Sequence, residues 1–365
     1  MKMEENPRYL TEQLITYIGN KRTLLPMIGS GVKAVCKRLG KTRLSIFDAF
    51  AGSGVVSRYF KQYSHTLYSN DLEDYCRILN TCYLTNHSAP HLHDLPQLHQ
   101  ALLAEVEQHP CPGLMAELYA PQDDEHIHAG ERVFYTRRNA VYLDTARQCI
   151  AKMPTEKQAY FLAPLLTQAS VHTNTSGVFK GFHKNEHGIG QFGGRGKNAL
   201  QRILAPISLP LPIFSRFECD CHILQRDATV AAKHLPAIDL AYLDPPYNQH
   251  PYGSNYFMLN FLANYTRPDR MSKISGIPAD WHRSAYNTRA KAATELEQLI
   301  TAIPASHLLI SYNSEGFITQ EQMTDILHRH GKVSLMQQEY ATFKGCRNLR
   351  NRAPHVREFL YLVER

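Results

Sequence analysis

The chain has 365 residues, of which 43% are hydrophobic and 20% charged, and this is ordinary for a globular protein with one large domain and an insertion, or with two domains. Its net charge of +7 favours a polyanionic partner. The amino terminus lacks the apolar core of a signal peptide, no apolar run approaches the length of a membrane span, and the eight cysteines are scattered without metal-ligand spacing. We therefore expect a cytoplasmic protein with no membrane segment and no metal.

Strand and helix patterns alternate near the amino terminus and return in the second half of the chain. Between them lie roughly 130 residues of different character, about the size of a small domain, with helical patches and then a glycine-rich polar stretch. The predicted strands are 44–48, 67–71, 219–224, 238–243, 307–312 and 358–363, and helices are predicted at 55–62 and 72–84. We predict an α/β fold in which residues 1–84 and 219–365 form one sheet domain and 85–218 form a mainly helical inserted domain.

The turn after the first predicted strand has the composition of a ligand-binding turn. Gly52 and Gly54 let the main chain approach a ligand, and the helix that follows offers free N–H groups. A dinucleotide dehydrogenase would have a third glycine where this chain has Ser57, which weakens that alternative. Asp71, at the end of the second strand, is placed to accept hydrogen bonds from ribose hydroxyls. Asp227, after the third core strand, either bonds the amino group of a bound adenine or caps the next helix.

The sequence Asp244-Pro245-Pro246-Tyr247 directly follows the buried strand at 238–243. Open α/β sheets bind ligands at this end of their strands. The two prolines fix φ and remove two N–H donors, so the turn offers carbonyl oxygens without competing donors. An Asp carboxylate beside a fixed carbonyl can accept both protons of a planar amino group, and Tyr247 can cover the face of the ring that carries it. The pattern indicates a site for an exocyclic amine on a heterocycle, with an incidental proline turn as the alternative.

Taken together, these residues resemble the Dam-type (α-class) adenine-N6 DNA methyltransferases. The segments that match are, in order, Tyr17 to Arg22, Phe50 to Gly54, Asn70-Asp71, an inserted region, and Asp244 to Tyr247. The resemblance covers roughly residues 10–84 and 219–265 and touches the insertion. It implies a Rossmann-like methyltransferase sheet with an inserted target-recognition domain, S-adenosyl-L-methionine as the cofactor, double-stranded DNA as the substrate, and a cognate restriction endonuclease as a further partner.

The resemblance also implies roles for individual residues. Lys21 lies near the methionine carboxylate of the cofactor, Tyr17 helps to hold it, Asp71 binds the ribose, and the glycine turn lines the methionine side. The family often has Gly-Gly-Lys where this chain has Gly19-Asn20-Lys21, so the lysine is retained. The expected cofactor-binding residues are Tyr17, Lys21, Asp48, Phe50, Gly52, Gly54, Asp71, Asp227 and Asp244. The expected catalytic residues are Asp244, Pro245, Pro246 and Tyr247.

The expected chemistry follows from the weak nucleophilicity of adenine N6, whose lone pair is delocalised into the ring. Bonding both amino protons to Asp244 and to the Pro245 carbonyl would free that lone pair for in-line attack on the sulfonium methyl group. The target base is inaccessible inside a duplex, so we expect it to be flipped out and stacked on Tyr247.

Residues 173–202, called the basic loop below, are the expected DNA contact. Their start, 173–181, is similar to the target-recognition hairpin of several family members, with Lys180 where the family often has Asn. Basic side chains on such a loop suit phosphate contacts, although a solvated surface loop is the alternative. The expected DNA-binding residues are Lys180, Lys184, Arg195 and Lys197. A second basic run either flanks the DNA or is a charged surface loop, and it comprises Lys344, Arg347, Arg350, Arg352 and Arg357.

Three alternatives remain at this stage. The same architecture serves cytosine-N4 methyltransferases and RNA adenine methyltransferases, although an Asp at the first position of the Asp-Pro-Pro-Tyr turn favours adenine. A DNA-binding regulator without catalysis is the third alternative. Such a regulator would be expected to lose Asp244 or the cofactor-binding acids, and all of them are present here.

Overall fold

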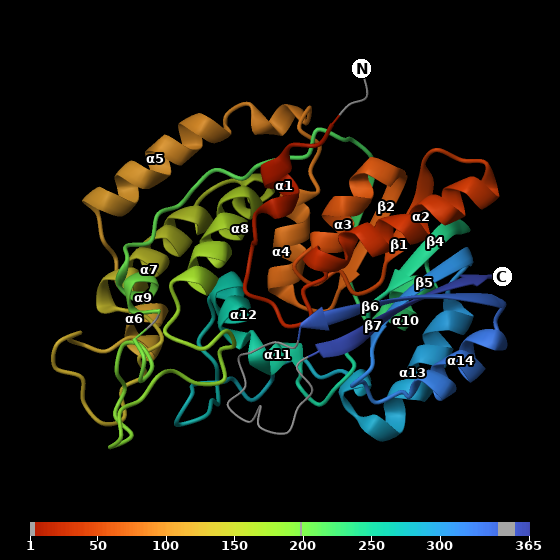
Figure 1. The fold of residues 1–365 in the computed structure, drawn as a ribbon. Helices are drawn as coiled ribbons and strands as arrows, with labels where there is room; N and C mark the ends of the chain where they lie inside the picture. The colour runs from red at the N-terminus through yellow and green to blue at the C-terminus, as the bar shows by residue number, and fades with distance from the viewer. Residues whose placement is uncertain (1–3, 198, 342–354) are drawn as a thin grey trace.

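The centre of the computed structural model is a seven-stranded sheet in the order β3-β2-β1-β4-β5-β7-β6 (Figure 1). The structure describes residues 4–197, 199–341 and 355–365. The strands are β1 (Leu44–Asp48), β2 (Ser64–Asp71), β3 (Asp220–Gln225), β4 (Ile238–Leu243), β5 (Ala305–Asn313), β6 (Lys332–Ala341) and β7 (His355–Glu364). Strands β1 to β5 pair in parallel, and β7 runs antiparallel to both of its neighbours. This mostly parallel sheet confirms the predicted α/β class.

Alternating side chains along the central strands bury both faces of the sheet. In β4, Leu240 and Tyr242 join one hydrophobic cluster, whereas Ala241 and Leu243 join another on the opposite face. Helices α2 (Leu25–Leu39) and α3 (Val55–Phe60) cover the first face, and α10 (Ala228–Ala232), α13 (Arg289–Ala302) and α14 (Gln320–His328) cover the second (Figure 1). A parallel sheet needs such two-sided cover because its strands are apolar on both faces.

A helical body packs beside the sheet, on the left in Figure 1. It is held by a third hydrophobic cluster that joins helices of the predicted insertion to α4 (Asp74–Tyr83), α12 (Phe257–Asn264) and the short α1 (Pro7–Thr11) from outside it. The helices of the insertion that share this cluster are α5 (Leu95–Gln108), α6 (Leu114–Tyr119), α7 (Arg137–Ala151) and α8 (Thr155–Val171). Because α4 and α12 pack into the same cluster, the helical body has no separate core of its own, and the domain boundaries at 84 and 218 stay a prediction.

The remaining elements are short. They are α9 (Leu200–Leu204), α11 (Tyr252–Asn255) and single 3₁₀ turns at Arg22–Leu24, Lys61–Tyr63, Pro90–Leu92 and Ala285–Asn287. Within the described residues, no helix has both the length and the apolar character needed to cross a membrane.

The sequence-based prediction missed β6, the strand at the edge of the sheet. Its second half, Gln337-Gln338-Glu339, is polar, and it pairs on one side only, with β7. An edge strand carries polar residues because one side faces solvent, so its hydrophobic pattern is weak.

The site lies where the parallel strands end. Asp48 at the end of β1 is in register with Ser69 of β2 and Tyr242 of β4, and β2 is in register with β3 through Asp71 and Gln225. The segments that leave these four strands therefore meet at one edge of the sheet, as the sequence predicts.

Candidate active site

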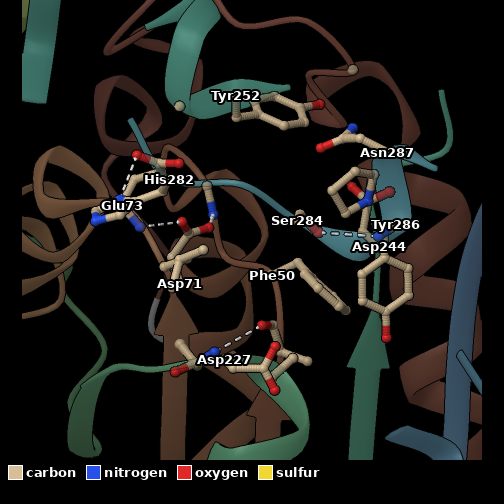
Figure 2. Close-up of a pocket in the computed structure, with 18 of the residues that line it drawn as sticks. Phe50, Asp71, Glu73, Asp227, Asp244, Tyr252, His282, Ser284, Tyr286 and Asn287 are labelled. Carbon is tan, nitrogen blue, oxygen red and sulfur yellow. Dashed lines mark hydrogen bonds and ion pairs between the residues drawn. The ribbon is translucent and has the colours of Figure 1, made fainter. Parts of the chain in front are cut away.

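A cavity with about 770 Å³ of open space lies at the carboxyl ends of β1 to β4 (Figure 2). Its walls come from six parts of the chain: the segment before α2, the turn after β1, the turn after β2, the start of α10, the turn after β4 with α11, and the loop before α13. The lining residues are Tyr17, Gly19, Ala49, Phe50, Gly52, Asn70, Asp71, Leu72, Glu73, Arg226, Asp227, Ala228, Asp244, Pro246, Tyr252, Gly253, His282, Ser284, Tyr286 and Asn287. Six of the nine expected cofactor-binding residues are among them, and the three that are not are Lys21, Asp48 and Gly54.

Asp71 holds the glycine turn in shape. Its two carboxylate oxygens accept hydrogen bonds from the main-chain N–H of Gly52 at 2.8 Å and of Glu73 at 3.0 Å. Gly52 and Gly54 have φ of +53° and +80°, a region that favours glycine, and a Cβ on Gly52 would lie 2.9 Å from the Tyr17 ring. Burial raises the pKa of Asp71 to about 6. The carboxylate is thus ionised at neutral pH and faces the cavity.

Asp244 forms an ion pair with Lys21. The Lys21 ammonium lies 2.9 Å from Asp244 Oδ1 and also donates to the Gly19 carbonyl at 3.1 Å. The Lys21 side chain is only 3% exposed, whereas Asp244 is 18% exposed and lines the cavity. Burial raises the pKa of Asp244 to about 6, although Lys21 acts in the opposite direction. Burial lowers the pKa of Lys21, but the Asp244 carboxylate outweighs burial and raises it above its ordinary value.

The rest of the Asp-Pro-Pro-Tyr turn surrounds this ion pair. Pro246 lines the cavity and Pro245 is buried beneath it. The Tyr247 ring is half-buried and packs edge-on against Tyr312, with 6.3 Å between the ring centroids. The aromatic ring is thus fixed beside Asp244 by the neighbouring strand β5.

Asp48 lies beneath the glycine turn and is fully buried. Its Oδ2 accepts a hydrogen bond from the Ser57 hydroxyl at 2.6 Å, and its Oδ1 has no hydrogen-bond partner in the described part of the chain. Burial raises the pKa of Asp48 to about 7. Ser57 is the residue that stands in place of a dehydrogenase's third glycine. Its hydroxyl group donates the hydrogen bond that holds the buried Asp48 carboxylate.

Asp227 is both part of the cavity wall and the cap of a helix. Its Oδ1 accepts from the main-chain N–H groups of Thr229 at 2.9 Å and Val230 at 3.2 Å at the start of α10. The helix-cap alternative is therefore confirmed, and the same side chain also faces the cavity.

Three tyrosines clamp the amino-terminal side of the cavity. The Tyr17 ring stacks against both Tyr252 and Tyr256, at centroid distances of 5.0 and 4.8 Å, and these two rings also stack on each other at 5.9 Å. Tyr252 donates to the Ile18 carbonyl at 3.0 Å, and the Ile18 N–H donates to the Tyr256 hydroxyl at 2.7 Å. Tyr17 is thus held over the glycine turn by residues that follow the Asp-Pro-Pro-Tyr turn.

The sequence missed the residues that close the far side of the cavity. Glu73 is buried, and its Oε2 accepts from Asn260 and lies 3.2 Å from His282 Nδ1. This contact with Glu73 raises the pKa of His282. Tyr286 packs edge-on against Phe50 at 5.3 Å. His282 comes from an irregular loop and Tyr286 from the single 3₁₀ turn that follows it, and neither has a hydrophobic period that would mark a residue for the site.

The basic loop is anchored at both ends. The buried Asn174 side chain donates to the carbonyls of Val133 and Gln191 at 2.7 and 2.8 Å, and accepts from the Gly193 N–H at 2.9 Å. The Phe179 N–H donates to the Asn255 carbonyl at 2.7 Å, so the loop is joined to α11. The chain between these anchors forms a small hairpin, with a bridge between residues 184 and 190. The four expected DNA-binding side chains, Lys180, Lys184, Arg195 and Lys197, are all exposed.

Most of the second basic run, Lys344, Arg347, Arg350 and Arg352, lies outside the described residues. Arg357 is exposed at the start of β7. Over residues 4–197, 199–341 and 355–365, no group of three or more His, Cys, Asp or Glu side chains could hold a metal ion.

Fold and site together have the architecture of an α/β enzyme, with one cavity at the carboxyl ends of parallel strands and an acid, a proline turn and an aromatic ring beside it. The chain belongs to the D12 class of N6 adenine-specific DNA methyltransferases, whose family model matches residues 17–326. This confirms the predicted resemblance and the predicted activity, site-specific methylation of adenine N6 in DNA.

Individual relatives are similar over nearly the whole chain. It is 30% identical over 362 residues to the Type II methyltransferase M.NlaIII of Neisseria lactamica, covering 96% of this chain and 99% of the relative. It is 26% identical over 355 residues to the Type II methyltransferase M.CviAII of Paramecium bursaria Chlorella virus 1, covering 96% and 98%. It is 29% identical over 369 residues to the modification methylase StsI of Streptococcus sanguinis, covering 96% of this chain and 52% of that longer relative.

Proposed function

We propose that the protein transfers the methyl group of S-adenosyl-L-methionine to N6 of an adenine flipped out of duplex DNA, and that it works beside a cognate restriction endonuclease. The observation that carries the proposal is the partly exposed Asp244 carboxylate, which shares one cavity with Asp71 and Asp227. The proposed endonuclease partner is supported by the Type II methyltransferases among the relatives.

The residues around the cavity fit S-adenosylmethionine. Asp71 would accept the ribose hydroxyls, and the part of Asp227 not bonded to α10 would accept the adenine amino group. Phe50 and Tyr286 offer apolar faces for the adenine ring, and the Gly52 turn leaves room for the methionine part. When bound, the cofactor supplies an electrophilic methyl group on a sulfonium.

Asp244 and the Pro245 carbonyl would do the chemical work on the target base. With a pKa of about 6, Asp244 is ionised at neutral pH and can accept one amino proton of adenine while the Pro245 carbonyl accepts the other. These two hydrogen bonds weaken the delocalisation of the N6 lone pair and direct it at the methyl group. The rate increase would come from positioning and preorganised electrostatics. Because the amine becomes acidic only once methylated, Asp244 would take its proton after transfer.

The basic loop is suited to present DNA to this cavity. The loop is joined to α11, and Tyr252 of α11 lines the cavity. The lysines and Arg195 of the loop are therefore connected to the cavity wall through α11. A base within a duplex must leave the stack to reach such a pocket, and Tyr247 offers a ring on which it would stack.

Transfer of a radioactive methyl group from S-adenosylmethionine to DNA tests the proposal. We expect Asp244→Asn to lose on the order of 100-fold or more in turnover, because an acceptor at the reacting centre becomes an amide. Tyr247→Phe should keep the stacking and much of the activity, whereas Tyr247→Ala should not. Asp325→Asn, an exposed acid on α14, is the matched control. Near-normal turnover by Asp244→Asn would falsify the assignment.

A further inference from the structure

A buried carboxylate next to the proposed catalytic ion pair has no part in the mechanism above. Glu358 of β7 is only 3% exposed. Its Oε1 accepts a hydrogen bond from the Asn313 side chain at 3.0 Å, whereas its Oε2 is buried and has no hydrogen-bond partner among the residues the structure describes. A buried carboxylate oxygen without a donor is costly, so the position calls for an explanation.

Glu358 lies at the same edge of the sheet as Asp244. It is in register with Asn313 at the carboxyl end of β5, and β5 is the neighbour of β4, which Asp244 directly follows. The charge of Glu358 acts on both members of the ion pair. Burial lowers the pKa of Lys21, and Asp244 and then Glu358 raise it. The charges of two carboxylates therefore act on the Lys21 ammonium, and Asp244 is the one that forms an ion pair with it.

The ion pair poses a conflict for catalysis. Asp244 is bonded to Lys21, yet in the proposed function it must accept a proton of the target amine. If Asp244 turned to the amine, the buried Lys21 ammonium would lose this counter-ion. Among the residues that the structure describes, its one other hydrogen bond is to the Gly19 carbonyl. A buried ammonium without a counter-ion is costly in free energy, and this cost would oppose the movement of Asp244 towards the amine.

We propose that Glu358 is a positioning residue that takes over Lys21 through its free Oε2 when Asp244 engages the adenine amino group. Glu358 itself touches neither substrate nor cofactor. Its role is to keep Lys21 neutralised in both arrangements, so that the Asp244 carboxylate is available to the base. This inference rests on the proposed role of Asp244.

Binding of the target amino group tests the inference without relying on turnover. Two duplexes are compared in the presence of S-adenosylhomocysteine, one with adenine at the target position and one with purine, which lacks the amino group. We expect the wild type to bind the adenine duplex more tightly and Glu358→Gln to lose most of this difference, because Lys21 then keeps Asp244. Glu364→Gln, a partly exposed acid on the same strand that pairs with Arg38, is the control and should keep it.

Steady-state kinetics adds a readout that a merely structural role would not move. Glu358→Gln should lower kcat by about 10- to 100-fold with little change in cofactor affinity. The pH below which kcat falls should move down by about half a pH unit, because burial still raises the pKa of Asp244 but the added effect of the Glu358 charge is gone.

Two further variants separate positioning from packing. Asn313→Ala removes the hydrogen bond to Glu358 but leaves its charge, so it should keep the preference for the adenine duplex. Glu358→Asp keeps the charge and should retain part of the preference for the adenine duplex. This variant keeps the test decisive if Glu358→Gln does not fold. If Glu358→Gln is folded and matches the wild type in preference and kcat, or if Asn313→Ala loses the preference equally, the inference is wrong. If the wild type shows no preference and methylates no adenine, the proposed function fails with it.

Discussion

Asp71 offers the sharpest test of the cofactor site, because the structure shows what its carboxylate holds. In Asp71→Asn one of the two oxygens becomes an NH₂ group, so either the Gly52 N–H or the Glu73 N–H loses its charged acceptor. A hydrogen bond to a charged group contributes about 1.5–3 kcal/mol. If that loss falls on cofactor binding, the Kd for S-adenosylmethionine rises roughly 10- to 150-fold.

Calorimetric titration of S-adenosylmethionine into each variant at pH 7.5 measures this effect. Asp220→Asn, an exposed acid at the other end of the neighbouring strand β3, serves as the control and should bind like the wild type. The pKa of Asp71 is raised to about 6, so its carboxylate is lost as the pH falls through 6. Wild-type affinity should therefore fall between pH 7 and pH 5, and less so in Asp71→Asn. Binding by Asp71→Asn within twofold of the wild type would refute the argument.

Three further predictions concern the basic loop and the buried acid beneath the turn. Lys184→Ala and Lys197→Ala should weaken binding to every DNA sequence and reduce the salt slope by about one unit each, as measured by titrations at several salt concentrations. Lys180→Ala and Arg195→Ala should instead relax preference at one position of the site by about 1–3 kcal/mol, as read from methylation of a randomised-site library; unchanged preference in both would place recognition elsewhere. Asp48→Asn should raise the free energy of unfolding at pH 8 by on the order of 2–4 kcal/mol, because a carboxyl with a raised folded pKa of about 7 favours the folded state only at low pH. Denaturant titrations should show that gain shrinking towards pH 4, and a gain that persists there would contradict the assignment.

The sequence predicted the parts of the site that lie at the ends of strands. Asp71, Asp227 and Asp244 each lie at or just after the carboxyl end of a predicted strand, and parallel strands bring these ends to one edge of a sheet. The structure places these three acids around one cavity, as Figure 2 shows. Their roles toward cofactor and base remain predictions. That the three acids lie close together follows from the strand patterns in the sequence and from the parallel order of the strands in the sheet.

The rest of the site depends on contacts between distant segments that no local pattern encodes. His282 meets Glu73 from an irregular loop about two hundred residues further along the chain. The same holds for the pairing of Lys21 with Asp244 and for Glu358, which looks in sequence like any acid within a strand. Tertiary packing, rather than propensity, decides which of these charged groups are buried together.

The central claim is that this protein methylates adenine N6, with the Asp244 turn as its reacting centre. The most direct measurement incubates the protein with duplex DNA and S-adenosylmethionine that carries a labelled methyl group, then digests the DNA and separates the nucleosides by mass spectrometry. The label is predicted to appear in N6-methyldeoxyadenosine with the wild type and to disappear with Asp244→Asn. Label in N4-methyldeoxycytidine, or undiminished label with Asp244→Asn, would contradict the claim.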